Sequence, residues 1–257
     1  MIHFGPAGLG PVKTALTQLE AYHKKGFRAC EIAFTYGAYI KSETDAQAIG
    51  KKAKELGISL SIHAPYFVNL NSAEKAKREA SKVRILECCR VGHLLQAKTV
   101  VFHPGYYGED REASYQQVRT SVSELLTEVK RNKWNILLAP ETMGKVNVFG
   151  SVEEVSRLVK DTGCSFCIDF AHILARDKAV DYAKVEKLFP GKSWHVHFSG
   201  IIYGEKGEKS HKTTTPEEWK QLLTALSKDK EIIIINESPT LIEDSELGLK
   251  IYSKLKD

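Results

Sequence analysis

Short apolar runs alternate with longer amphipathic stretches along the whole chain. The runs are rich in β-branched and aromatic side chains, which is typical of buried strands. In the longer stretches apolar residues recur three and four positions apart, as in Val118, Val122 and Leu125, which predicts helices. The predicted strands are residues 2–4, 29–34, 59–63, 99–103, 135–141, 165–169, 194–198 and 231–237. The predicted helices are residues 13–25, 43–56, 73–97, 112–132, 151–161, 180–188, 215–228 and 243–255.

This alternation predicts an α/β fold made of one domain, residues 1–257. Eight strand-then-helix units in 257 residues give about 32 residues per unit, the size expected for a single (β/α)8 TIM barrel. A doubly wound open sheet is the alternative, because the same alternation builds one. No glycine-rich dinucleotide or P-loop fingerprint follows a predicted strand, since Gly5-Pro6-Ala7-Gly8-Leu9-Gly10 lacks the required spacing.

Composition narrows the class of protein only a little. The net charge of +5 permits an anionic partner such as nucleic acid without requiring one. The five cysteines are odd in number and suggest no secreted disulfide framework, so a reducing cytoplasm is expected. Cys164 and Cys167 have a metal-type or redox-type spacing, but a second pair is missing. No signal-like or membrane-spanning run is present in the sequence, which also indicates a cytoplasmic protein without a membrane partner.

Histidines and acids stand where the predicted strands end. In a parallel barrel the C-terminal strand ends gather at one rim, where catalytic groups lie. Taken singly, each residue has a structural explanation, such as a hydrogen-bonded histidine or a capping acid. The residues at strand ends are His63, His103, Glu141, Asp169, His197 and Glu237, with His172 just after Asp169 and with Glu208 and His211 in a charged loop.

Together these side chains predict a metal cluster. Several carboxylates at one rim would repel one another, and cations are their natural partners. Imidazoles mixed with carboxylates, without thiolates, suit Zn²⁺, Mn²⁺ or Fe²⁺ better than Ca²⁺. There are more ligands than one tetrahedral ion needs, so we expect two or three ions, an arrangement used in phosphoryl displacement. His195 and His197 share a strand face; His197, nearer the strand end, is the predicted ligand, and His195 lies deeper.

In this order the motifs resemble the endonuclease IV family of apurinic/apyrimidinic endonucleases, TIM barrels with a trinuclear zinc site. The likeness covers essentially the whole chain. It implies that His63 and His103 hold the first zinc, that Glu141 bridges it to the second, and that His172 belongs to the third. It also implies that Asp169, His197 and Glu237 complete the second site. The motifs are His63-Ala64-Pro65-Tyr66, Phe102-His103-Pro104-Gly105, Glu141-Thr142, Cys167-Ile168-Asp169-Phe170-Ala171-His172 and Glu237-Ser238-Pro239.

One loop departs from the family pattern, which supplies Asp-x-His to the third zinc. Here Lys209 stands two residues before His211, and the nearest acid is Glu208, three residues before it. His211 is therefore the expected ligand of this loop, and Glu208 is a candidate whose place water could take.

The resemblance implies a zinc-dependent endonuclease that hydrolyses the phosphodiester 5′ to abasic sites in base-excision repair. Glu141 would bridge ions, and Glu237 would orient the attacking water or bind metal, as the catalytic pair. Two to three Zn²⁺ ions are expected, with Mn²⁺ or Fe²⁺ able to replace part of the zinc. The partner would be damaged double-stranded DNA, bound by a monomer.

DNA contacts are expected after the first histidine motif and in the charged loop. Tyr66 and Phe67 stand where the family wedges side chains into the base stack, although they could simply pack the loop. Phosphate contacts are expected from three lysines, for which a solvated loop is an equal explanation. These are Lys206, Lys209 and Lys212.

Two rival functions remain open. A sugar isomerase or epimerase of the xylose-isomerase-like barrels would use an acid-rich site on one or two metals, and its ligands would be Glu141, Asp169, His197 and Glu237. The additional histidines argue against it, because such a site would not use them. A DNA-binding descendant without catalysis is the third hypothesis, suggested by the altered loop before His211.

Overall fold

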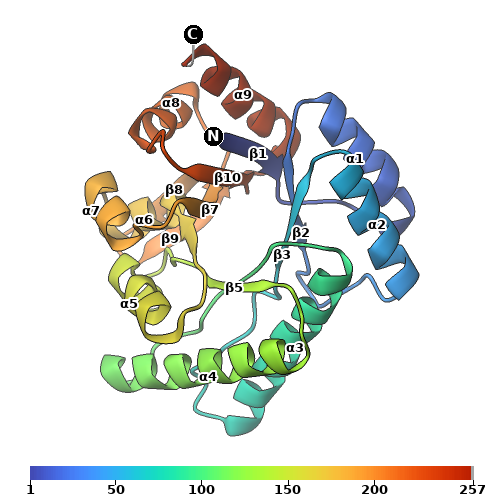
Figure 1. Ribbon diagram of the computed structural model, residues 1–257. Coiled ribbons are helices and arrows are strands. Elements are labelled where there is room, and N and C mark those ends of the chain that lie inside the picture. The colour runs from blue at the N-terminus through green and yellow to red at the C-terminus, as the bar shows by residue number, and fades with distance from the viewer. Residues whose placement is uncertain (256–257) are drawn as a thin grey trace.

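The computed structural model describes residues 1–255, in which parallel strands form a ring surrounded by helices (Figure 1). The predicted TIM barrel is confirmed, and the open-sheet alternative is wrong because the helices lie outside the ring rather than on two faces of a sheet (Figure 1). The barrel strands are β1 (Ile2–Pro6), β2 (Ala29–Ala33), β3 (Ser59–His63), β4 (Thr99–Phe102), β5 (Leu137–Pro140), β6 (Cys167–Asp169), β7 (Ser193–Phe198) and β10 (Glu231–Asn236).

Strand pairing runs in two parallel four-stranded sheets, ordered β1-β10-β7-β6 and β2-β3-β4-β5. The Arg28 amide donates to the Phe4 carbonyl at 3.0 Å and joins β2 to β1. A parallel bridge between Glu141 and Cys167 joins β5 to β6. The two sheets therefore close on each other, and the C-terminal ends of all their strands point to the same rim.

The helices follow the predicted segments closely, apart from one that was not expected. Asp169 ends β6, and its side chain accepts a hydrogen bond from the His172 amide, so α6 begins at once. His172 therefore lies in the first turn of a helix that the sequence pattern does not predict. The helices are α1 (Ala15–Lys24), α2 (Glu43–Glu55), α3 (Lys75–Leu94), α4 (Arg111–Arg131), α5 (Val152–Thr162), α6 (Phe170–Asp177), α7 (Tyr182–Leu188), α8 (Pro216–Ala225) and α9 (Leu241–Lys254), with a short 3₁₀ turn at Val12–Thr14.

The apolar stripe of α4 packs against the barrel as its spacing predicts. Val118, Val122, Leu125 and Val129 are buried, and Leu126 is half-buried. Each such side chain stabilises the fold by about 1.5–3 kcal/mol when fully buried. Contacts of this kind hold the helices on the strands and fix the rim on which the site is built.

An antiparallel hairpin, β8 (Gly200–Gly204) and β9 (Gly207–Lys212), stands where the sequence predicts a charged loop. Gly207 pairs with Lys145 across the rim, and the Glu208 amide donates to the Gly144 carbonyl at 3.0 Å. A Cβ at Gly207 would lie 2.1 Å from that carbonyl oxygen, and φ is +91° there, so only glycine fits. This close approach fixes the hairpin over the barrel mouth.

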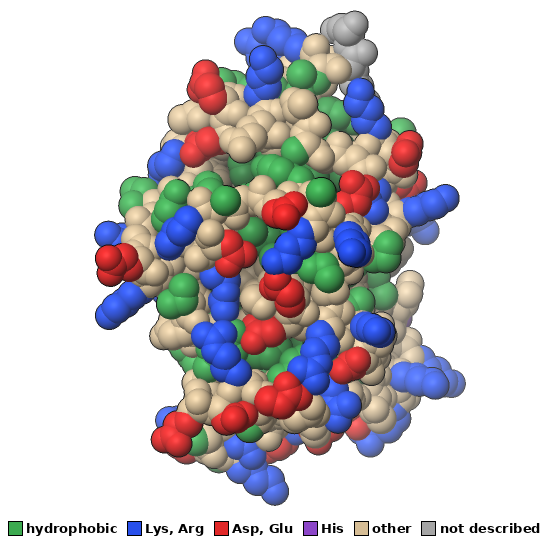
Figure 2. Space-filling model, turned by 90° about the vertical axis from the view of Figure 1, so that its left-hand side faces the viewer, with side chains coloured by type: hydrophobic (Ala, Val, Ile, Leu, Met, Phe, Trp, Pro, Cys, Tyr) green, Lys and Arg blue, Asp and Glu red, His purple; other side chains and the backbone are tan. Residues whose placement is uncertain are grey.

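Within residues 1–255, no helix combines the length and apolar character needed to cross a membrane. Figure 2 shows basic and acidic side chains interspersed over one face instead of a single basic patch. All five cysteines are buried free thiols.

Candidate metal centre

Glu141 lies at the centre of the site, at the end of β5, and its side chain is fully buried. Its Oε2 atom faces His103 Nε2 at 3.0 Å and His63 Nε2 at 3.3 Å. Its Oε1 atom faces His197 Nδ1 at 3.1 Å and His172 Nδ1 at 3.4 Å. The two oxygen atoms therefore face different histidines, which is the geometry of a carboxylate placed between two cation sites.

A second group surrounds the Oε1 side of this carboxylate. Ligand atoms of Glu141, Asp169, His197 and Glu237 all lie within 4.8 Å of one another. Asp169 caps α6 with Oδ1, whereas its Oδ2 is buried and has no hydrogen-bond partner within residues 1–255. An orphaned buried carboxylate oxygen is costly unless a cation satisfies it. Asp169 therefore combines the capping role with an oxygen available for a metal.

A third group joins α6 to the hairpin through His172, Glu208 and His211, whose ligand atoms also lie within 4.8 Å of one another. His172 Nε2 lies 3.4 Å from Glu208 Oε2. Gly144 makes this approach possible, because a Cβ there would lie 2.8 Å from Glu208 Cβ and 2.9 Å from His172 Cδ2. The structure thus brings Glu208 to the other two residues despite its shifted spacing in the sequence.

Three of these histidines are oriented by neutral oxygen atoms behind them. Each directs Nδ1 to an oxygen, which favours the tautomer with Nδ1–H and an Nε2 lone pair. In His63 and His172 the Nε2 atom faces Glu141 and Glu208, respectively. The contacts are His63 Nδ1 to the Ala64 carbonyl at 2.7 Å, His172 Nδ1 to the Thr142 carbonyl at 3.0 Å and His211 Nδ1 to the Ser199 hydroxyl at 2.6 Å. With the orphaned Asp169 oxygen and the close approach of Glu208 and His172 at Gly144, these orientations fit a group of divalent cations of the zinc type.

The carboxylates and imidazoles shift one another's pKa values strongly. Burial opposes ionisation of Glu141, but His197, His103 and His172 hold its pKa well below the ordinary value. Burial opposes the charged form of His172, but Asp169 and Glu141 raise its pKa well above the ordinary value. Burial likewise opposes charge on His197, and Cys167 and the surrounding carboxylates raise its pKa. Cations entering the site must therefore displace protons from histidines.

Metal affinity is accordingly expected to increase with pH. Each proton displaced from His172 or His197 should tighten binding by about tenfold per pH unit while that histidine remains protonated. Competition with a chromophoric chelator, calibrated at each pH between about 6 and about 8, measures this dependence. An affinity that stays flat over this range would show that metal binding displaces no proton from His172 or His197.

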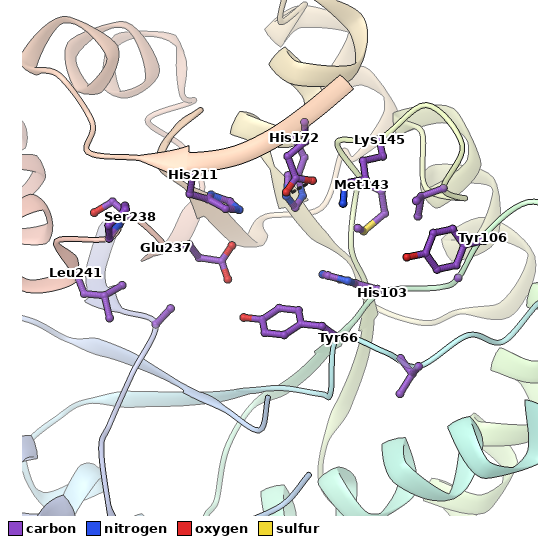
Figure 3. Close-up of a pocket in the computed structure, with 16 residues that line it drawn as sticks. Tyr66, His103, Tyr106, Met143, Lys145, His172, His211, Glu237, Ser238 and Leu241 are labelled. Atoms are coloured by element: carbon purple, nitrogen blue, oxygen red, sulfur yellow. Dashed lines mark ion pairs between the residues drawn. The ribbon is translucent and has the colours of Figure 1, made fainter. Parts of the chain in front are cut away.

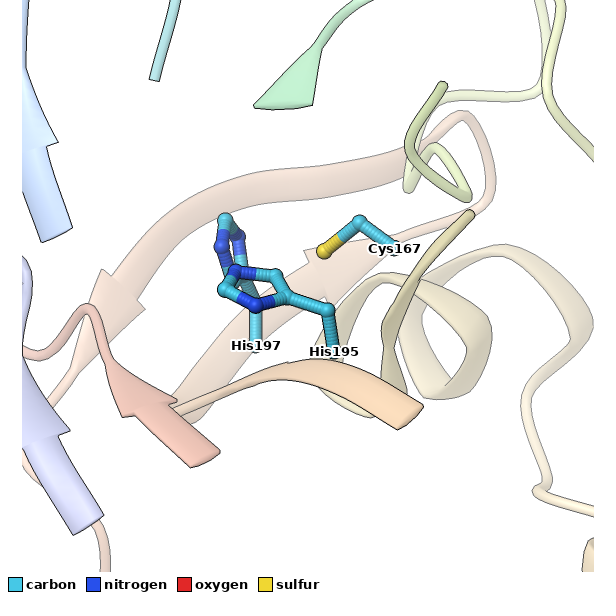
Figure 4. A group of neighbouring side chains, drawn as sticks. All are labelled: Cys167, His195 and His197. Atoms are coloured by element: carbon cyan, nitrogen blue, oxygen red, sulfur yellow. The ribbon is translucent and has the colours of Figure 1, made fainter. Parts of the chain in front are cut away.

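Glu31 and Lys145 are site residues that the sequence interpretation missed. Glu31 is fully buried in the middle of β2, 3.0 Å from His195 Nε2 and 3.0 Å from His197 Nε2. An acid inside the apolar run 29–34 was the available signal, because alternation puts it on the inward face. As predicted for His195, this histidine lies below the rim, where Figure 4 shows it beside His197 and Cys167.

A cavity of about 570 Å³ opens above the three groups of candidate metal ligands. Figure 3 shows His103, His172, His211 and Glu237 around it, with Lys145 and Tyr106 to one side. Within the described chain, Lys145 is the one lysine or arginine that lines this cavity. An anionic group would find its positive charge here.

The residues predicted to bind DNA lie around the same mouth or on the hairpin. Tyr66 lines the cavity and stacks on His63 with ring centroids 4.6 Å apart. Phe67 is 54% exposed, which leaves its ring accessible. Lys206 and Lys209 are exposed, whereas Lys212 forms an ion pair with Glu218 at 2.8 Å.

Sequence comparisons identify two kinds of relative. The chain is 34% identical to the uncharacterized protein MJ0133 of Methanocaldococcus jannaschii over an alignment 275 positions long, covering 99% of this chain and 98% of that protein. It is 28% identical over 142 residues to the probable endonuclease 4 of Mycobacterium tuberculosis, covering 54% of each chain. The second match therefore spans about half of each protein.

Solved structures with the same fold include SacUVDE, an endonuclease and a sugar epimerase. SacUVDE matches with a TM-score of 0.77 and 16% identity, covering 99% of this chain and 98% of that one. Endonuclease IV from Thermus thermophilus matches with a TM-score of 0.71 and 20% identity, covering 98% of both chains. D-psicose 3-epimerase matches with a TM-score of 0.67 and 17% identity, covering 99% of this chain and 93% of that one. At these identities the structural likeness establishes the fold alone.

The resemblance to endonuclease IV expected from the motifs is confirmed by the sequence match and the shared fold. A family model described as xylose isomerase-like TIM barrel matches residues 19–249. Since that match spans most of the chain and the MJ0133 alignment nearly all of it, the protein belongs to the xylose isomerase-like TIM barrel family.

Proposed function

We propose that the protein is a metal-dependent endonuclease of DNA repair, hydrolysing the phosphodiester bond 5′ to an abasic site. The observation that carries the proposal is the sharing of ligands between adjacent groups at one rim. Glu141 belongs both to the group with His63 and His103 and to the group with Asp169, His197 and Glu237. Several cations held side by side are typical of phosphodiester hydrolysis, and the partial sequence match to endonuclease 4 supports the same reaction.

The chain's own residues divide the work of such a reaction. Burial opposes ionisation of Glu237, but His197 lowers the pKa of Glu237 to about 2. Its carboxylate is then ionised at neutral pH, so it accepts a hydrogen bond from an attacking water and orients it. Divalent cations in this site would supply Lewis acidity, acidifying water and neutralising charge on phosphate oxygens. Tyr66 at the mouth offers an aromatic face to a nucleotide next to the opened lesion.

The direct test is incision of a duplex that carries a single tetrahydrofuran abasic analogue. Protein loaded with zinc or manganese is expected to cut once, 5′ to the analogue, and to leave an undamaged duplex of the same sequence intact. Verified metal loading without incision at low salt would overturn the proposal. Binding to the abasic duplex in that case would identify a DNA-binding protein without catalysis.

Lys145 is expected to bind a phosphate of the substrate. Removing the ammonium group in Lys145→Ala should raise KM roughly 10- to 100-fold, since a hydrogen bond to a charged group contributes about 1.5–3 kcal/mol. The value of kcat should change much less, because the metal-type groups remain. Steady-state incision kinetics measure both constants.

The matched control for that variant is Lys130→Ala, which removes an exposed lysine from the last turn of α4, outside the cavity. Its KM should equal that of the wild type. An equal effect of the two substitutions would mean that Lys145 acts only through the net charge of the protein.

A sugar epimerase is the second candidate, favoured by one feature. Glu141, Asp169, His197 and Glu237 form a compact four-ligand group by themselves, sufficient for one cation. Such a site would leave four histidines without a role as ligands, and we therefore rank the epimerase second. These are His63, His103, His172 and His211. Conversion of D-fructose to its C3 epimer by protein holding a single ion, without incision of abasic DNA, would establish this alternative.

A further inference from the structure

Glu31 is an acid that the proposed reaction does not use. Its carboxylate lies inside the barrel with no exposed surface. Ser61 Oγ donates to its Oε2 atom at 2.8 Å, and His195 Nε2 lies 3.0 Å from the same atom. A buried carboxylate is costly, and these two contacts hold it in one orientation. That orientation directs Oε1 at His197 Nε2, 3.0 Å away.

His197 lies between this carboxylate and the metal-type group. Its Nδ1 atom faces Glu141 at 3.1 Å and Glu237 at 3.5 Å, whereas its Nε2 atom faces Glu31. One ring nitrogen can offer a lone pair to a cation only when the other carries the proton. A proton on Nε2, held by Glu31, leaves the Nδ1 lone pair on the side of Glu141 and Glu237.

His197 differs from His63, His172 and His211 in the partner of its outward nitrogen. The shortest contact of the outward nitrogen is to a neutral oxygen in His63, His172 and His211, but to a carboxylate in His197. A charged acceptor forms a stronger hydrogen bond and makes the imidazole a more basic ligand. Glu31 Oε1 and His197 Nε2 are both buried and have no hydrogen-bond partner of regular geometry within residues 1–255, yet they lie 3.0 Å apart, so each can satisfy the other.

The neighbouring thiol does not compete for this proton. Figure 4 shows the Cys167 sulfur directed toward the rings of His195 and His197. A thiol sulfur is only a weak hydrogen-bond acceptor, whereas a carboxylate is a strong one. Glu31 Oε1, 3.0 Å from His197 Nε2, is therefore the stronger acceptor on this side of His197.

We propose that Glu31 is a positioning residue that fixes the ring orientation and tautomer of His197, so that His197 binds a cation through Nδ1. Ser61 and His195 act behind Glu31 by holding its other oxygen. The inference rests on the proposed metal centre but not on the nature of the substrate. It predicts that the ion between Glu141, Asp169, His197 and Glu237 depends on Glu31, whereas the ions at the other two groups do not.

Metal binding by Glu31→Gln tests this directly. One ion should bind about 10- to 100-fold more weakly than in the wild type, the usual loss when such a supporting partner is removed, and the remaining ions should keep their affinity. Titration with Co²⁺ followed by visible absorption adds a spectroscopic signature, because the ligand-field bands of that one ion should change. Ser61→Ala, which keeps the charge but loosens the carboxylate, should give a smaller shift in the same direction.

The matched control is Glu55→Gln, the same change at an exposed position at the end of α2, which should bind Co²⁺ as the wild type does. A folded Glu31→Gln protein with unchanged affinities and spectrum would overturn the inference. If Glu31→Gln does not fold, Glu31→Asp and Ser61→Ala replace it, and unchanged titrations of both would overturn the inference equally.

Further measurements distinguish this inference from a metal site at Cys167 and from the proposed endonuclease function. Loss of one bound ion in Cys167→Ser would show that Cys167 holds an internal cation together with His195 and His197, which contradicts a positioning role for Glu31. Wild-type protein that binds metal but cuts no abasic DNA would remove the proposed function while the Glu31 result still stands. Wild-type protein that binds no metal would remove both.

Discussion

Glu141→Gln is expected to abolish most incision activity and to release at least one bound cation. The Glu141 carboxylate contacts His63, His103 and His197, so a neutral amide there weakens two adjacent cation sites at once. Loss of one preorganised electrostatic contact typically lowers kcat by about 10²–10³-fold, and we expect at least that loss here. Single-turnover incision rates and metal content, measured on the same preparation, check the prediction.

Glu55→Gln provides the comparison for that experiment, since it removes an equivalent charge from an exposed position. It should retain both activity and metal. A folded Glu141→Gln protein with full metal content and wild-type rate would show that the central carboxylate holds no cation.

Chelation is expected to lower the thermal stability of the protein markedly. Cations that bind only the folded chain stabilise it, by about 4 kcal/mol when their concentration is 1,000 times Kd. For a chain of this size that energy corresponds to a fall in Tm of roughly 10 °C after the metal is removed. Melting curves followed by circular dichroism, with and without chelator and after zinc is restored, measure the shift.

The same melting curves on Glu141→Gln should show a smaller shift, because this variant binds fewer ions before chelator is added. An identical Tm for the wild type before and after complete metal removal would contradict the prediction. It would show that the buried acids and histidines neutralise one another's charge without bound cations.

The barrel and most of its rim were predictable because each strand and the residue that ends it can be recognised from a short stretch of sequence. Each apolar run has strand periodicity, and His63, His103 and Glu237 follow or end such runs directly. Once parallel strands form a barrel, their ends must meet at one rim. His197 was distinguished from His195 by depth along a single strand, which the pairing of His197 with Asp169 and Ile235 places at the rim.

The hairpin and the contacts beneath the rim were not predictable in the same way. Residues 207–212 are polar and have no strand periodicity, and their pairing depends on the approach of Gly207 to Gly144 from another loop. The role of Glu31 depends on β2 and β7 facing each other across the barrel, at a separation of 166 residues from His197. Lys145 reaches the cavity through the bridge with Gly207. Tertiary contacts decide each of these positions.

The number of cations per chain tests the central claim most directly. Elemental analysis of protein equilibrated with zinc, after unbound metal has been removed, counts the ions that the rim holds. The arrangement of His63, His103, Glu141, Asp169, His172, His197, Glu208, His211 and Glu237 predicts two to three ions per chain. A single ion would favour the sugar epimerase, and a chain that takes up no metal would contradict the account of this site.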